Sequence, residues 1–121
     1  MRDEEAIDCL NKAIQIDSDQ DEAWRIKGSV LSILGKNDEA LECYNKAIEI
    51  NSQCALTWKE RGWTLDSLGK YEEAIMSYDE SLKLKSDDPD TWHLRGLSLM
   101  AVGNYKEALE SFNKATKIKN N

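Results

Sequence analysis

Apolar residues recur every three or four positions along most of the chain, which is the spacing of one face of an α-helix. Over residues 21–34 this stripe consists of Trp24, Gly28 and Leu31, and it predicts a first helix. A second helix is predicted soon after Gly35, with an apolar face made of Ala40, Leu41, Tyr44, Ala47 and Ile48. No stretch shows the alternation of apolar and polar residues that marks a strand. The pattern therefore predicts an all-α chain of paired helices.

The helical pair repeats with a period of 34 residues. Complete units are predicted at 21–54, 55–88 and 89–121, the last of them one residue short. Residues 1–20 fit the same frame one repeat earlier, as the second helix of an incomplete unit. Five columns carry the period: Trp24, Trp58 and Trp92; Gly28, Gly62 and Gly96; Gly35, Gly69 and Gly103; Ala40, Ala74 and Ala108; Tyr44, Tyr78 and Phe112.

The ends of the helices carry their own signals. Gly35 and its equivalents follow the first helix, where a left-handed residue ends a helix without a Cβ clash. Acidic pairs such as Glu72 and Glu73 open the second helix, where the helix dipole favours negative charge. The run Ser-Asp-Asp-Pro at 86–89 predicts a cap followed by proline at the first helical position.

A helix pair of about 30 residues cannot bury its own apolar face, so copies must stack on one another. The pattern W-x3-G-x2-L-x3-G-x4-A-x3-[YF] at this period resembles the tetratricopeptide repeat and covers nearly the whole chain. The resemblance implies a right-handed superhelix (an α-solenoid) of antiparallel helix hairpins, with about seven helices. Many members of that family have leucine where this chain has Lys27, Arg61 and Arg95. We expect their stems to cover the helix pair while their charges reach water.

Composition limits the classes of partner and the cellular compartment that we expect for the chain. Sixteen basic and 23 acidic side chains give a net charge of −7, which disfavours binding to a phosphate backbone, so no nucleic-acid partner is expected. No apolar run approaches the length of a membrane span, and no membrane partner is expected. Three cysteines, Cys9, Cys43 and Cys54, lack the spacing of a zinc site or a disulfide framework. We therefore expect a reducing cytoplasm, with no metal and no cofactor.

The resemblance also implies a function, because arrays of this family are interaction scaffolds. Their concave surface, lined by the first helices, usually holds a peptide or helix of a protein partner. Trp63, Leu97 and Met100 stand out, because they fall outside the repeating core columns and suggest an apolar binding patch. Packing locally or against a missing neighbouring repeat is an alternative for them, and a solvated face is an alternative for the basic stripe of Arg25, Lys59 and His93. The predicted partner-binding residues are Arg25, Ser29, Lys59, Trp63, Asp66, His93, Leu97 and Met100.

Two other ligand or function classes have less support. Some members of the family clamp an acidic C-terminal peptide, at positions that correspond here to Arg25, Ser29, Glu60, Asp90 and Leu94. Glu60 and Asp90 would repel such a peptide, so we do not expect that ligand. Catalysis is not expected either, because the single histidine, His93, has no Ser, Cys or carboxylate arrangement that the sequence ties to it.

A structural role is the main alternative function. The first helix lacks its hairpin partner, and no further helix follows to cover Phe112 and Ile118. Both ends are then uncapped, as in a piece of a longer array. They would permit weak self-association end to end, or the chain would serve as a spacer in a longer protein.

Overall fold

The computed structural model describes residue 11 and residues 20–120. It contains six α-helices in this part of the chain, and no strand among them. A seventh helix, expected within residues 1–20, lies outside the described residues. The helices are α2 (Asp21–Ile33), α3 (Asn37–Ile50), α4 (Ala55–Ser67), α5 (Tyr71–Leu84), α6 (Pro89–Ala101) and α7 (Tyr105–Lys119).

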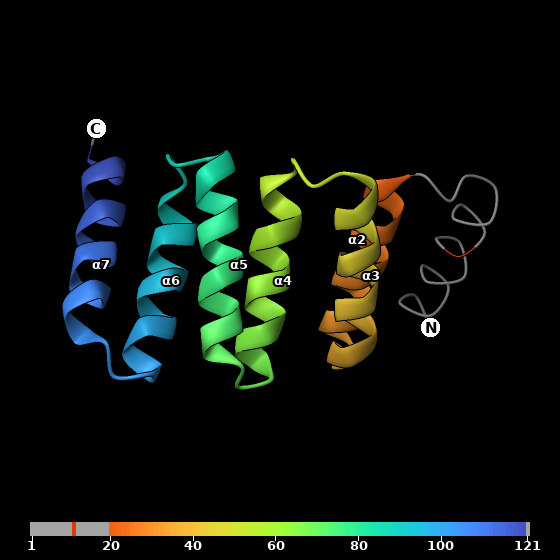
Figure 1. Ribbon diagram of the computed structural model, residues 1–121, viewed down its shortest axis with the longest axis horizontal. Coiled ribbons are helices and arrows are strands. Elements are labelled where there is room, and N and C mark those ends of the chain that lie inside the picture. Colours follow the sequence, from red (N-terminus) through yellow and green to blue (C-terminus); the bar gives the residue numbers. More distant parts are fainter. Residues whose placement is uncertain (1–10, 12–19, 121) are drawn as a thin grey trace.

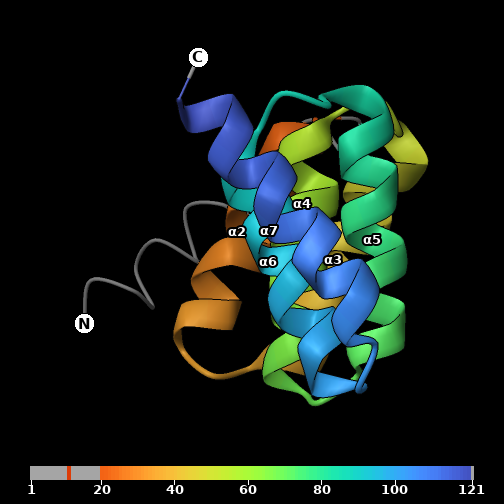
Figure 2. The ribbon, with the colours of Figure 1, turned by 90° about the vertical axis from the view of Figure 1, so that its left-hand side faces the viewer.

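The helices form three hairpins that stand side by side in chain order (Figure 1). Within a hairpin the two helices pack closely, and the second helix of one hairpin packs on the first helix of the next. Figure 2 looks along this row, with α7 nearest the viewer. The predicted solenoid of antiparallel helix hairpins is confirmed.

Each hairpin turn is built in the same way. The glycines Gly35, Gly69 and Gly103 have φ angles of 82°, 77° and 83°, a left-handed conformation that other residues adopt only with strain. The amide of Lys36 donates to the carbonyl of Leu31, and Lys70 and Asn104 repeat this bond. These bonds satisfy backbone carbonyls that have no hydrogen-bond partner within the helix. The predicted glycine stops are therefore confirmed, and they make the three turns equivalent.

The core of a hairpin is a contact between a glycine and an aromatic ring. A Cβ atom on Gly28, Gly62 or Gly96 would lie 2.8, 2.6 or 2.5 Å from the ring at the paired position on the second helix. That ring belongs to Tyr44, Tyr78 and Phe112 respectively. Only glycine permits this approach of the two helices. The small and large residues of the repeat are thus two halves of one contact.

Neighbouring hairpins share their cores. Leu41 of α3 and Leu94 of α6 both pack against the buried cluster of Leu65, Ala74 and Tyr78 in the middle hairpin. Burial of these side chains supplies the main favourable energy of stacking. The predicted cap before α6 is also confirmed, because the Asp88 side chain accepts the amide of Asp90 and Pro89 opens the helix.

Candidate functional site

The first helices α2, α4 and α6 form one face of the solenoid, called here the first-helix face, and all eight predicted partner-binding residues belong to these helices. The residues fall into two groups. Arg25, Ser29, Lys59 and Asp66 are held by contacts within the protein, whereas Trp63, His93, Leu97 and Met100 are exposed.

The contact between α2 and α4 on this face is closed by polar groups. Arg25 Nη1 lies 2.9 Å from Glu60 Oε1 in a part-buried ion pair, and the Ser29 hydroxyl donates to the other oxygen of Glu60. The Tyr44 hydroxyl in turn donates to Ser29 Oγ at 3.4 Å. Both ends of this network are satisfied, so a ligand would have to displace internal bonds to use Arg25.

The contact between α4 and α6 is different, because Leu94 stands where Glu60 stands one repeat earlier. The apolar side chain of Leu94 therefore takes the place of the carboxylate that joins α2 to α4. A hollow of about 360 Å³ opens here, called the α4–α6 groove below. Its lining residues are Leu56, Lys59, Glu60, Trp63, Asp90, His93 and Leu94.

Four large apolar side chains of α4 and α6 are exposed in this part of the face. Leu56, Trp63, Leu97 and Met100 have exposed fractions of 45, 53, 47 and 46%. Trp63 and Leu97 occupy the same position in consecutive repeats, where the first hairpin has Ser29. Leu56 and Trp63 line the groove, and Leu97 and Met100 lie on α6, at the positions that Trp63 and Asp66 occupy on α4. These four residues are called the apolar patch below, because exposed apolar residues grouped on neighbouring helices mark interaction sites.

The cation of the groove is neutralised by acidic neighbours. Lys59 Nζ lies 3.1 Å from Asp88 Oδ2 and 4.0 Å from Asp90 Oδ2. Partial burial raises the pKa of Asp88, but hydrogen bonds from Thr91 and Lys59 outweigh this effect, and the pKa of Asp88 lies below its ordinary value. Lys59 is therefore held in place at the edge of the groove.

Asp66 joins three helices. Its Oδ2 atom accepts the hydroxyl of Tyr78 on α5, and its Oδ1 atom accepts the hydroxyl of Ser98 on α6, each at 2.6 Å. Burial, the hydrogen bond to Asp66 and the charge of Asp66 raise the pKa of Tyr78 well above its ordinary value. The phenol therefore remains a donor over the physiological pH range.

His93 is exposed, and its ring lies against Phe112 with the ring centres 5.3 Å apart.

The thiol of Cys43 is buried, and burial raises its pKa, which suppresses the reactive thiolate. Cys43 and Cys54 are both free, whereas Cys9 lies outside the described residues. In residues 20–120 no three His, Cys, Asp or Glu side chains are grouped to hold a metal ion.

Glu60 and Leu94 were not among the predicted binding residues, although each lines the groove. Their column reads Ile26, Glu60 and Leu94, so nothing recurs in it. A search for repeating columns passes over such a position. A groove residue of this kind is indicated instead by a position that changes from charged to apolar between neighbouring repeats on the same face.

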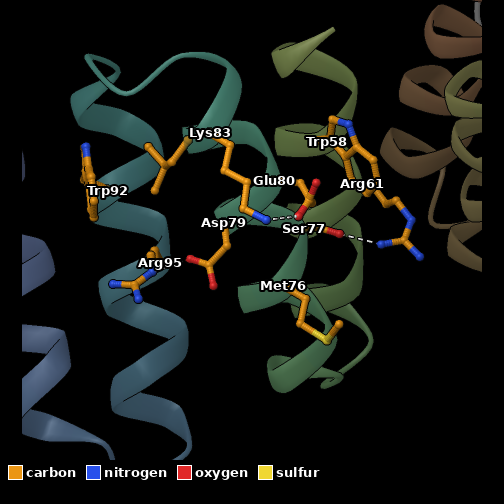
Figure 3. A pocket seen from close by; sticks show the side chains of 10 residues that line it. Trp58, Arg61, Met76, Ser77, Asp79, Glu80, Lys83, Trp92 and Arg95 are labelled. Carbon is orange, nitrogen blue, oxygen red and sulfur yellow. Dashed lines mark hydrogen bonds and ion pairs between the residues drawn. The ribbon is translucent and has the colours of Figure 1, made fainter. Parts of the chain in front are cut away.

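A larger hollow of about 830 Å³ lies elsewhere, between α4, α5 and α6 (Figure 3). Its charges satisfy one another: Lys83 pairs with Glu80 at 2.8 Å and Arg95 pairs with Asp79 at 2.7 Å. Arg61 donates to Ser77 of α5, as the dashed line shows, and to Asn45 of α3. The pair of Lys83 and Glu80 lies within α5, whereas the contacts of Arg61 and Arg95 join neighbouring helices, so this hollow lies where the helices stack.

The expectation for Lys27, Arg61 and Arg95 was incomplete. Their charged groups do not simply reach water: they lie over the rings of Trp24, Trp58 and Trp92, 5.5 to 5.9 Å from the ring centres. The two arginines also donate hydrogen bonds to neighbouring helices. The spacing of three residues between tryptophan and cation, repeated in every unit, was the available signal.

The fold and this face define a helical-repeat solenoid. The sequence profile of the tetratricopeptide repeat matches residues 19–87, and a second profile of the same description matches residues 89–121. The chain belongs to the tetratricopeptide repeat family. No helix among the described residues has the length and apolar character needed to cross a membrane. No curated protein matches the chain at a significant level.

Solved structures with the same fold include two crystal structures of MamA, each 26% identical to the chain. Each match covers 98% of this chain, with TM-scores of 0.94 and 0.92. The matches cover 69% and 64% of those chains, so this chain spans about two thirds of their length. The second tetratricopeptide repeat domain of Spaghetti (RPAP3), bound to the HSP90 peptide SRMEEVD, is 24% identical with a TM-score of 0.80. That match covers 88% of this chain and 98% of the other, and at this identity it shows the fold alone.

Proposed function

We propose that this chain is a protein-binding module whose concave groove holds a peptide or helix of a partner protein. The observation that carries the proposal is the apolar patch of Leu56, Trp63, Leu97 and Met100, which is exposed beside the α4–α6 groove. Buried aromatic anchors at the centre of an interface contribute most of its affinity, and Trp63 is the largest side chain available for that role.

The fold supports this proposal, because a protein with the same architecture has been solved with a peptide bound. The ligand there is an HSP90 peptide, and we do not propose that ligand class for this chain. Arg25 is already paired with Glu60, and Asp90 adds a further negative charge beside the groove. An acidic peptide would meet repulsion and would find no free cation at these positions.

The proposed role is non-catalytic, and we further propose a cytoplasmic location and no nucleic-acid partner. His93 packs on an aromatic ring, and the thiol of Cys43 is buried. The free cysteines and the net charge of −7 support the last two proposals.

An affinity capture from the lysate of the native cell tests the proposed function. The wild-type chain and the variant Trp63→Glu are compared, with captured proteins identified by mass spectrometry. A matched control is Met76→Glu, because Met76 is also an exposed apolar residue (68%) but lines the other hollow. We expect a partner that is lost with Trp63→Glu and retained with Met76→Glu. Equal capture by all three proteins, or capture of nothing specific, would contradict the proposal.

A second candidate is a structural role, as a spacer or a self-assembling segment. Leu109 is 61% exposed on α7, whereas Leu41 and Ile75 at the same position are partly buried. Phe112 and Ile118, which we expected to be uncovered, are partly buried, because Phe112 packs on Gly96 within its own hairpin. The exposed large apolar residues of α7 are Tyr105 (66%) and Leu109 (61%). Sedimentation at rising concentration tests this role: it predicts growing oligomers that Leu109→Glu abolishes, and a monomer at all concentrations would refute self-assembly.

A further inference from the structure

We propose that the partner segment in the α4–α6 groove is basic, with a bulky apolar side chain flanked by lysine or arginine. This inference rests on the proposed function and adds to it the chemistry of the partner. It follows from the placement of charges on the first-helix face and from the position of two carboxylates at the ends of the apolar patch.

The helices α2, α4 and α6 carry five basic and five acidic side chains, but the two kinds are placed differently. Lys27, Arg61 and Arg95 lie over the tryptophan rings of their own helices. The two cations among the predicted partner-binding residues, Arg25 and Lys59, are paired with Glu60 and Asp88 and mostly buried, with side-chain exposed fractions of 18% and 24%. Asp66 and Asp90 are then the charges left beside the apolar patch, and they favour a positive partner.

Asp66 carries a charge that no cation offsets among the described residues. Its two hydrogen-bond donors are the neutral hydroxyls of Tyr78 and Ser98. It lies one helical turn from Trp63, and Met100 occupies the same position in the next repeat. A partner that covers Trp63 and Met100 also removes water from Asp66. Desolvation of an unpaired carboxylate is unfavourable, so an uncharged partner binds less well than one that brings a cation.

Asp90 supplies negative charge at the other end of the groove. Its side chain is 71% exposed, and it lies 4.0 Å from Lys59, which is closer to Asp88. Asp90 occupies the same position in its repeat as Leu56, ten residues before the position of Asp66 and Met100. At about 1.5 Å per residue, the two acidic ends are separated by roughly 15 Å along the helix axes.

This separation sets the expected arrangement of the partner. The apolar anchor lies against Leu56, Trp63 and Leu94, between the two acidic ends. Basic residues on its two sides then reach Asp66 and Asp90. A span of roughly 15 Å corresponds to about ten residues of a helix or about five of an extended segment.

A selection from a library of displayed random 16-residue peptides tests the inference. The library is selected on the wild-type chain after depletion on Trp63→Glu, so that the recovered peptides depend on the groove. We expect recovered sequences with a net positive charge and a bulky apolar residue between basic ones. Recovery of acidic or uncharged sequences would overturn the basic partner and leave the proposed function standing. Failure to recover any sequence beyond those that bind Trp63→Glu would overturn both.

The charges are then tested directly with one recovered peptide made by synthesis. Asp90→Asn is expected to weaken its binding by about two- to fivefold, as for an exposed ion pair, whereas Glu72→Gln on α5 leaves binding unchanged. Asp66→Asn is measured in parallel, with a thermal melt to confirm folding. Binding is also expected to weaken as salt rises. Unchanged affinity in both aspartate variants, or no dependence on salt, would overturn the inference.

Discussion

The hydroxyl group of Tyr78 links α5 to the contact between α4 and α6, and the substitution Tyr78→Phe removes that group alone. Tyr78 Oη donates to Asp66 at 2.6 Å, and its side chain is 0% exposed. Water therefore does not reach the hydroxyl in the folded protein. The ring itself stays in place, because Phe112 fills the same position in the third hairpin without a hydroxyl.

The expected loss follows from the charge of the acceptor. A hydrogen bond to a charged group contributes about 1.5–3 kcal/mol. Asp66 is partly exposed, so water replaces the lost donor in part, and we expect the lower half of that range, about 1.5–2 kcal/mol. The matched control is Tyr44→Phe, because the Tyr44 hydroxyl has only neutral partners, Ser29 at 3.4 Å and Thr64. Bonds to these neutral hydroxyls should contribute less, about 0.5 kcal/mol.

Urea unfolding followed by circular dichroism measures both losses. We expect the midpoint to fall clearly in Tyr78→Phe and hardly at all in Tyr44→Phe, with the slope of the transition unchanged in both. Equal losses in the two variants would refute the assignment of the energy to the charged acceptor. An unchanged midpoint in Tyr78→Phe would refute the role of Asp66 as a link between the helices.

Two further changes probe packing and charge. In Gly62→Ala the new Cβ would lie 2.6 Å from the Tyr78 ring, and the overpacking should cost about 1–3 kcal/mol. This cost should exceed the gain of about 1 kcal/mol in helix propensity, so we expect a lower melting temperature. A higher melting temperature would contradict this prediction. The pKa of Asp88 is lowered in the folded state, so its carboxylate stabilises the fold above its unfolded pKa of about 3.9 and loses that effect as the pH falls through the folded pKa. The free energy of unfolding of Asp88→Asn should therefore lie below that of the parent by a constant amount between about pH 5 and 7, and the difference should shrink below about pH 4. A difference that stays the same as the pH falls from 7 would contradict the prediction.

The recurring residues made the fold predictable. Gly35 and its equivalents mark the turns, and the pairing of Gly28 with Tyr44 follows from a shared period, so one repeat predicts the next. The candidate site was predictable only by position, since the eight residues were placed on the first helices without their partners. The bonds of Glu60 with Arg25 and Ser29 join side chains that lie 31 to 35 residues apart and occur in one contact only. Periodicity carries no information about a pair that does not recur.

These unrepeated bonds have a consequence for the order of the hairpins. The turns and the ring-on-glycine contacts are equivalent, so in shape any hairpin could follow any other. The polar contacts are not equivalent: placing the third hairpin directly after the first would set Arg25 against Leu94 instead of Glu60. A part-buried cation would then lose its partner, at a cost that a correctly ordered array avoids. The residues common to all repeats thus determine the structure of a hairpin, and the residues that differ between repeats determine the order in which the hairpins stack.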